Sequence, residues 1–285
     1  RDYIQAKPKM RPASGPGMRR VFVATNERRS AHSVNREIRA VRAWLNWMRE
    51  RGLVDLTSDA IADAQKQTRT APLEITTLTP PQCRGLLLAA MRHDARNPKR
   101  YPSALFVGAM LVLGLRLGEA EGLRWDDIDL DRKDNAGTTV GGVYIDKGSN
   151  YTKRTRWVLL HVSPGLREAF RRAKRTGPFV FGGSSPMART TSAAARKRMK
   201  KAVADPDFDW KKVRRTTGSH LTTALNGWTL IQAARQMGHS AEVAQRHYLE
   251  AFHGIRGDTI DETMGIADLM ARIPVLPGDD LSDLD

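Results

Sequence analysis

The stretch ALFVGAMLVLGLRLGEAEGLRW, from Ala104 to Trp125, decides the fold. Its first half is an apolar run that is too short to span a membrane, so it predicts a buried helix over 103–114. Its second half, RLGEAEGLRW, predicts a further short helix. Arg116 therefore stands at the start of a polar helix that directly follows a buried one.

The segments around this stretch predict more helices and one hairpin. The run TTVGGVYIDKGSNYTKRTRWVLLHV (138–162) has two β-rich stretches around a polar turn with glycine, as expected of a β-hairpin. Thr79, followed by two prolines, is suited to cap a helix before the buried one, and Thr229 with Gln232 forms a capping box later in the chain. Helices are expected near 165–175, 186–203, 212–226, 230–237 and 241–251. The predicted fold class is mainly α with a small β-sheet.

The N-terminal part differs in character. Residues 1–29 are polar, basic and rich in proline and glycine, which predicts a flexible basic arm or part of a larger element. A helix is expected over 33–51, because apolar residues recur every three or four positions, and a second helix is expected over 55–67. We place a helical domain at 30–70, a linker at 71–80, a mixed α/β domain at 81–255, and a C-terminal helix with an acidic tail at 256–285.

Composition points to a polyanionic partner. The 285 residues carry a net charge of +16, with a pI near 10.4. Residues 255–285 contain two arginines and eight acidic residues, so this tail has a net charge of −6 and the rest of the chain carries +22. A basic surface of this kind favours nucleic acid. A single cysteine excludes an internal disulfide framework. We find no signal peptide and no apolar run of membrane length. We therefore expect a cytoplasmic, nucleoid-associated protein with no membrane partner.

Four segments carry side chains suited to phosphate chemistry. Arg116 begins the short polar helix, and the predicted hairpin carries lysines. Lys211 and Arg214 are three residues apart, which puts them on one helical face. His239 follows a glycine and precedes Tyr248 by nine residues. Taken alone, each of these residues would more often be a surface or packing residue, and it is their combination that predicts a site.

In this order and spacing, the segments resemble the tyrosine recombinase (phage integrase) family. The resemblance covers roughly residues 33–255 and is strongest in LGLRLGEAEGLRWDDID and MGHSAEVAQRHYLE. It implies an N-terminal helical core-binding (SAM-like) domain and a C-terminal mixed α/β catalytic domain. It also implies a site-specific DNA recombinase or integrase, encoded by a bacterium, phage or mobile element, that cleaves and rejoins strands through a 3′-phosphotyrosyl intermediate.

The resemblance also assigns roles to individual residues. The two arginines of the family fall on Arg116 and Arg214, its histidine on His239 and its nucleophile on Tyr248. The family most often has histidine where this chain has Lys211, which leaves the division of acid and base roles open. For the lysine of the hairpin we favour Lys147, with Lys153 as the alternative.

Physical chemistry fits these roles. Guanidinium groups donate paired hydrogen bonds to phosphate, so Arg116 and Arg214 suit the non-bridging oxygens. A phenol with a pKa near ~10 needs nearby cations or a base before it can attack, and His239 can assist Tyr248. A hairpin lysine can protonate the leaving 5′ oxygen. We expect no metal ion and no cofactor, because the sequence offers no set of ligands with suitable spacing.

The remaining expectations concern partners. We expect double-stranded DNA to contact six arginines outside the predicted catalytic site: Arg36, Arg39, Arg42, Arg196, Arg198 and Arg215. The family acts as a homotetramer on two DNA sites, with accessory DNA-bending or directionality proteins in some members. We expect residues 260–270 to form an amphipathic helix that docks on a neighbouring subunit, and the acidic end to be disordered. Two alternatives stay open: a type IB topoisomerase-like enzyme, and a DNA-binding protein of the same fold with impaired cleavage.

Overall fold

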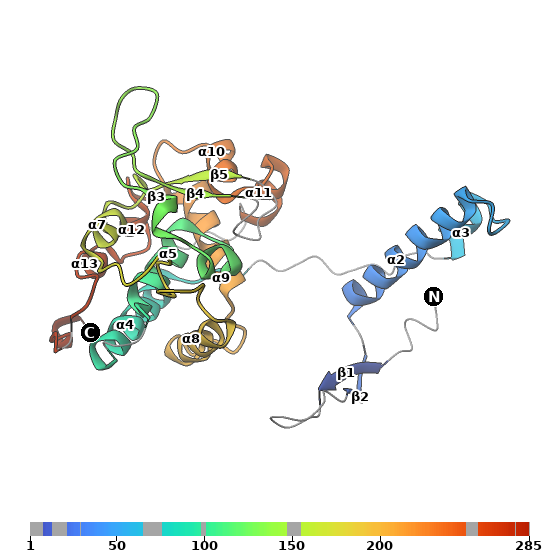
Figure 1. The fold of residues 1–285 in the computed structure, drawn as a ribbon, viewed down its shortest axis with the longest axis horizontal. Coiled ribbons are helices and arrows are strands. Elements are labelled where there is room, and N and C mark those ends of the chain that lie inside the picture. Colours follow the sequence, from blue (N-terminus) through green and yellow to red (C-terminus); the bar gives the residue numbers. More distant parts are fainter. Residues whose placement is uncertain are drawn as a thin grey trace. The chain divides into compact units, whose positions relative to one another are not determined.

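The chain divides into two compact units, residues 1–74 and 75–285, in a computed structural model (Figure 1). The structure describes residues 8–12, 22–28, 30–64, 76–97, 101–146, 155–248, 256–276 and 278–284. The boundary between the units lies inside the segment 71–80, which the sequence analysis assigned to a linker.

The N-terminal unit begins with a two-stranded antiparallel sheet of β1 (Pro8–Pro12) and β2 (Phe22–Arg28). Pro8 lies opposite Arg28, and Pro12 lies opposite Phe22. These residues form strands and not a flexible arm, and the other expectation for 1–29, part of a larger element, stays a prediction. The run FVATNER contains phenylalanine, valine and threonine, which favour strands, but the prolines and glycines around it obscured this signal.

The described part of this unit also contains two helices that the sequence predicted. They are α2 (Ala31–Glu50) and α3 (Ser58–Ala64). Ser30 caps α2, because its hydroxyl oxygen accepts the backbone N–H of Ser33 at 3.2 Å. Three apolar side chains of these helices are buried: Val34, Ile38 and Ile61.

The C-terminal unit is built around α5 (Ser103–Leu113), in which every residue is buried. A helix that is apolar on all sides must be surrounded, and α4 (Pro80–Arg96), α7 (Pro164–Arg172) and α9 (Trp210–Ser219) pack against it. This confirms the predicted buried helix and the cap of α4 at Thr79. No helix in the described part of the chain is long and apolar enough to cross a membrane.

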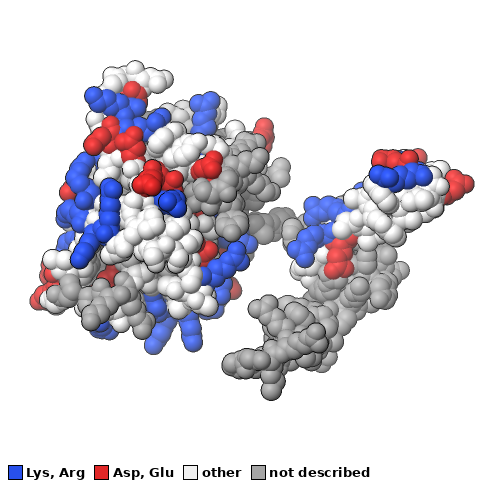
Figure 2. Space-filling model, viewed as in Figure 1, with Lys and Arg blue, Asp and Glu red and all other residues white. Residues whose placement is uncertain are grey.

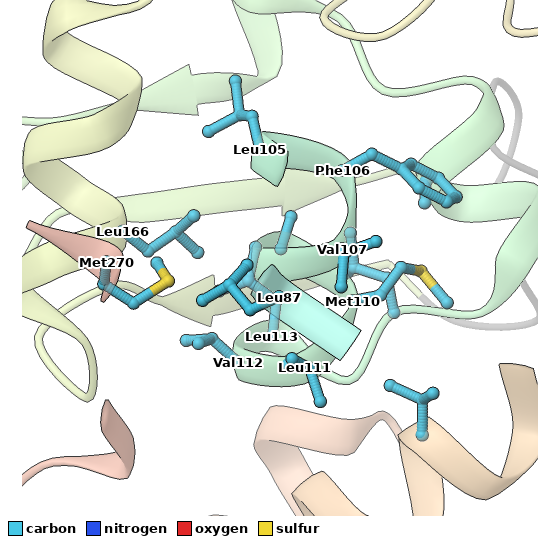
Figure 3. Packing of buried hydrophobic residues seen from close by; sticks show 14 of the residues in the cluster. Leu87, Leu105, Phe106, Val107, Met110, Leu111, Val112, Leu113, Leu166 and Met270 are labelled. Carbon is cyan, nitrogen blue, oxygen red and sulfur yellow. The ribbon is translucent and has the colours of Figure 1, made fainter. Parts of the chain in front are cut away.

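Side chains of α5 extend in several directions into this core (Figure 3). Leu87 comes from α4, Leu166 from α7 and Met270 from the C-terminal segment. The core therefore joins elements from both ends of the unit, and it fixes the C-terminal end of α5, where the polar helix begins.

A small antiparallel sheet forms the β part of this unit. Its strands are β3 (Ile128–Asp129), β4 (Gly142–Ile145) and β5 (Arg156–Leu159), in the order β3-β4-β5. Val143 pairs with Val158, as expected of the predicted hairpin. The sequence did not predict β3, because a strand of two residues leaves no periodic signal. β5 packs against α10 (Leu230–Met237).

The remaining helices follow the predicted order. They are α6 (Leu117–Glu121), α8 (Arg189–Ala202) and α11 (Ala241–Tyr248). The helix expected at 212–226 is α9 continued by a π-helical turn at His220–Ala224. The hydroxyl of Thr223 donates to the carbonyl of Ser219 at 2.6 Å, a contact that competes with regular helical hydrogen bonds.

The C-terminal segment corrects two expectations. It forms two short helices, α12 (Ile260–Thr263) and α13 (Ala267–Met270), because Gly265 between them has a φ of 65°. Their apolar side chains lie in the core of their own chain, so the described residues do not offer the predicted helix to a neighbouring subunit. The acidic end is ordered through Leu284, since Leu281 and Leu284 are buried.

Candidate active site

Arg214 lies at the centre of the site, on α9. Its guanidinium donates to the backbone carbonyls of Gly114 and Met237, and its Nη2 lies 2.8 Å from Nε2 of His239. Gly114 and Met237 lie at the C-terminal ends of α5 and α10, where unpaired carbonyls and the helix dipoles favour a cation. Only 9% of Arg214 is exposed, so these carbonyls replace its water.

Glycines end both of these helices in the left-handed conformation. Gly114 has a φ of 56° and Gly238 has a φ of 66°. A Cβ on Gly114 would lie 2.7 Å from Sδ of Met237, so the end of α5 and the end of α10 are in close contact. Glycine at these positions lets the chain turn while keeping both carbonyl-rich ends close to Arg214.

Arg116 is the N-cap residue of α6, two residues after Gly114. The carboxylate of Glu119 accepts its backbone N–H at 2.8 Å and its Nη1 at 2.8 Å. About a third of the Arg116 side chain is exposed, at 34%, whereas the Glu119 side chain is fully buried. The carboxylate therefore caps the helix and orients the guanidinium, and part of the Arg116 side chain remains exposed.

A second arginine shares this carboxylate. Arg156, the first residue of β5, donates its Nη1 to Oε1 of Glu119 at 3.0 Å and its Nη2 to Oε2 at 2.8 Å. Burial tends to raise the pKa of Glu119, but the hydrogen bonds and charge of Arg156, and then the contacts from Arg116, outweigh burial and lower the pKa to about 2. Glu119 is therefore ionised at neutral pH.

His239 connects the end of α10 to the start of α11. Its backbone N–H donates to the carbonyl of Ala234 at 2.9 Å, which fixes the turn after Gly238. Because a guanidinium can only donate, Nε2 of His239 accepts from Arg214, and the neutral ring carries its proton on Nδ1. The structure thus places the predicted histidine against the second predicted arginine.

Tyr248 is the last residue of α11, which packs against α9 and α10. The helix that carries the predicted nucleophile therefore contacts the two helices that carry Arg214 and lead to His239. The side chain of Tyr248 lies outside the described part of the chain, so its role as nucleophile stays a prediction.

A family model confirms what these segments indicate. The model of the phage integrase family matches residues 76–253, which is more than half of the chain and includes Arg116, Arg214, His239 and Tyr248. The chain belongs to the phage integrase (tyrosine recombinase) family. No curated protein matches this sequence.

Solved structures of tyrosine recombinases share the fold. The Tn1549 transposon integrase in complex with a circular intermediate DNA matches with a TM-score of 0.53 and 16% identity over 79% of this chain and 77% of that chain. A lambda integrase dimer bound to a COC′ core site matches with a TM-score of 0.52 and 13% identity, over 76% and 73%. At these identities the likeness establishes the fold alone.

Other residues predicted for this tyrosine recombinase are only partly placed. Lys147 and Lys153 lie outside the described residues. Lys211 lies one turn before Arg214 on α9 and is exposed, while Arg214 is buried. The same helix thus carries a buried cation and an exposed one.

The arginines predicted to contact DNA lie in different environments. Arg36, Arg39 and Arg196 are exposed, and Arg215 is half-buried. Arg42 donates to the carbonyl of Ala62 at 3.2 Å, and Arg198 turns back to hydrogen-bond the hydroxyl of Tyr101. Lysine and arginine side chains project from the lower edge of the C-terminal unit, where Figure 1 places α8 (Figure 2). DNA contact by these residues stays a prediction.

Sequence reasoning missed Arg156. It is one of several basic residues at the end of the predicted hairpin loop, and nothing in the local pattern separates it from Arg154. The signal that could have found it is Glu119, one turn after Arg116 in a helix that follows a buried one, because a carboxylate that becomes buried there needs positive partners. Within the described part of the chain, no group of three or more His, Cys, Asp or Glu side chains could hold a metal ion.

Proposed function

We propose that this chain is a site-specific DNA recombinase that cleaves and rejoins strands through a 3′-phosphotyrosyl intermediate. One observation carries the proposal: Arg214, buried at the ends of two helices, hydrogen-bonds His239 and the carbonyl two residues before Arg116. Family membership adds the reaction class, and α11 adds a tyrosine at the end of a helix packed on the same elements.

The proposed cleavage is an in-line displacement at phosphorus. The phenolic oxygen of Tyr248 forms a bond to phosphorus while the bond to the 5′ oxygen breaks. The phenol gives up its proton to water, because Nε2 of His239 accepts from Arg214, and the Nδ1–H of His239 can donate to a phosphoryl oxygen. The 5′ oxygen gains a proton, for which Lys147 or Lys153 is the candidate donor.

The two arginines stabilise the charge that develops on the non-bridging oxygens. Arg214 is held in place before substrate arrives, so it needs little reorganisation. Arg116 offers a partly exposed guanidinium oriented by Glu119. Because the phosphotyrosyl ester retains the energy of the broken bond, a 5′ hydroxyl from a second strand can reverse the step without ATP.

The proposed partner is double-stranded DNA, and the proposed active form is a homotetramer on two sites. The net charge of +16 favours such a partner, and both solved structures reported above are complexes with DNA. Accessory DNA-bending or directionality proteins belong to the same proposal. The C-terminal segment packs in the core of its own chain. In the tetramer, either this segment detaches and binds a neighbouring subunit, or other surfaces make the contacts between subunits.

Covalent trapping tests the proposal and identifies the DNA site in the same experiment. The purified chain is incubated with a pool of randomised DNA duplexes that carry a nick, denatured with detergent, and the protein-linked DNA is recovered and sequenced. We expect enrichment of one sequence, linked through its 3′ phosphate, in the presence of a chelator. The variant Tyr248→Phe should bind the enriched duplex and form no adduct.

The products distinguish the alternatives. A plasmid with two copies of the enriched sequence should yield recombinants. Relaxation of the plasmid without recombinants would favour a topoisomerase-like enzyme. Binding with no adduct from the wild-type chain would favour a DNA-binding protein, and Lys211 at a position that is most often histidine is the feature that favours this outcome.

A further inference from the structure

We infer that Arg156 is a positioning residue of the cleavage reaction, which acts through Glu119 on Arg116. The inference rests on the proposed function and adds a residue that neither the family match nor the sequence pattern assigned. It starts from the position of Arg156, where three of the segments that carry predicted catalytic residues meet.

Arg156 is fully engaged in the interior of the protein. Its side chain is only 7% exposed, and its two terminal nitrogens are paired with the two oxygens of Glu119. Its Nε donates to the carbonyl of Gln236 at 3.2 Å. Because both terminal nitrogens pair with a carboxylate, and not with neutral carbonyls as in Arg214, Arg156 is poorly placed to clamp a phosphate itself, so any effect on the reaction must pass through its partners.

The first partner is the carboxylate beneath Arg116. Each oxygen of Glu119 accepts one hydrogen bond from Arg156 and one from Arg116. One negative charge is thus shared by two positive ones, and the group of three keeps a net charge of +1. Without Arg156, Glu119 would neutralise Arg116 alone and compete with the phosphate for its guanidinium.

The second partner is the turn that carries His239. A Cβ on Gly238 would lie 2.9 Å from Cδ and Nε of Arg156, so the arginine side chain packs directly on the glycine before His239. Gln236 ties β5 to the same place, because its side-chain amide exchanges two hydrogen bonds of 2.9 Å with the backbone of Leu159. Arg156 therefore holds β5, α6 and the end of α10 in one arrangement.

Both contacts require the shape of an arginine. Its planar fork pairs with the carboxylate through two parallel hydrogen bonds while Nε reaches a third acceptor, and an ammonium group can do only part of this. Lysine at 156 would keep the charge and lose the geometry. The pair of variants Arg156→Gln and Arg156→Lys thus separates the contribution of charge from that of shape.

Single-turnover cleavage of the trapped sequence tests the inference. We expect Arg156→Gln to slow formation of the covalent adduct roughly 10- to 100-fold, the range known for residues that orient metal ligands, with unchanged affinity for the duplex. Arg156→Lys should recover part of the loss. Arg84→Gln, which breaks an ion pair with Asp268, serves as the matched control and should cleave at the wild-type rate.

A double-mutant cycle gives a readout that a general loss of structure would not produce. In an Arg116→Lys background, Arg156→Gln should cost clearly less rate than in the wild type, because its main route, through Glu119 to Arg116, is already impaired. An equal loss in both backgrounds would overturn the inference, as would wild-type cleavage by Arg156→Gln. If Arg156→Gln does not fold, the same cycle with Arg156→Lys decides. Failure of the wild-type chain to form an adduct would instead overturn the proposed function.

Discussion

The two predicted catalytic arginines lie in contrasting surroundings. Arg214 is buried against neutral carbonyls at the ends of α5 and α10. Arg116 is partly exposed and pairs with a buried carboxylate that also binds Arg156. One cation is held by the backbone, and the other is held by opposite charge.

The contrast bears on how each group can respond to substrate. Helix ends cannot move without repacking the core, so Arg214 offers fixed donors and a preorganised positive charge. The surroundings of Arg116 depend on a balance of charges that an arriving phosphate can shift. We therefore expect variants around Arg214 to affect folding and cleavage together, and variants around Arg116 to affect cleavage in a manner that depends on charge.

The largest effect should follow Arg214→Lys. Lysine keeps the charge, but its single ammonium group cannot bind two carbonyls, His239 and a phosphate at the same time. We therefore expect adduct formation to slow by about 10³-fold, near the upper end of the range for loss of a preorganised donor. The melting temperature should also fall. Arg116→Lys is the matched comparison: it should slow cleavage and leave the melting temperature nearly unchanged. Equal melting temperatures for both variants would contradict the contrast.

The next effect concerns Glu119→Gln. Removal of this carboxylate leaves Arg156 buried without its ionic partner, which should lower the free energy of unfolding by about 3 kcal/mol at neutral pH. Because the folded-state pKa is about 2, below the ordinary 4.5, this stabilisation is complete above pH 4.5 and is lost as pH falls toward 2.

Denaturant unfolding of both proteins between pH 7 and pH 3 checks this sign. The difference between wild type and Glu119→Gln should stay constant at first and shrink below pH 4.5. Asp261 offers a contrast, since burial raises its pKa to about 6 and its ionised form is the destabilised one. Both proteins contain Asp261, so its titration cancels in the difference between them. A wild-type advantage that grows on acidification would therefore contradict the charge balance proposed for Glu119.

A smaller effect should follow Gly114→Ala. Its φ of 56° disfavours a side chain by about 1–2 kcal/mol, and the added Cβ would lie 2.7 Å from Sδ of Met237, which brings a further cost. The control is Gly137→Ala, where φ is also positive but nothing lies within 4 Å of the added Cβ. The difference in free energy of unfolding between the two variants measures how tightly the ends of α5 and α10 are packed around Arg214.

Much of this arrangement could be predicted from the sequence. The buried helix, the hairpin, the caps at Thr79 and Thr229 and the order of the helices rest on local patterns that the folded chain keeps. Arg214 and His239 were assigned through the family resemblance, and the structure brings them within hydrogen-bonding distance.

What could not be predicted depends on contacts between distant residues. Arg156 gains its place from Glu119, 37 positions earlier in the chain. The C-terminal segment has the composition of an exposed amphipathic helix and an acidic tail, yet Gly265 divides the helix and the core accepts its apolar side chains. Local pattern indicates that these side chains need a partner, but it does not indicate which surface supplies one.

The smallest effect should come from an ion pair that lacks the burial of Arg156. Arg84 and Asp268 approach to 2.7 Å, but 32% and 53% of their side chains are exposed, so water screens the attraction. Arg84→Gln should lower the free energy of unfolding by about 0.5 kcal/mol, and added salt should reduce this further. Glu119→Gln should respond much less to salt, since its carboxylate is fully buried. Both variants could instead lose the same stability with the same salt dependence. Burial would then not be what distinguishes the ion pairs of Glu119 from that of Arg84. The proposal that Arg156 acts through a desolvated carboxylate would lose its physical basis.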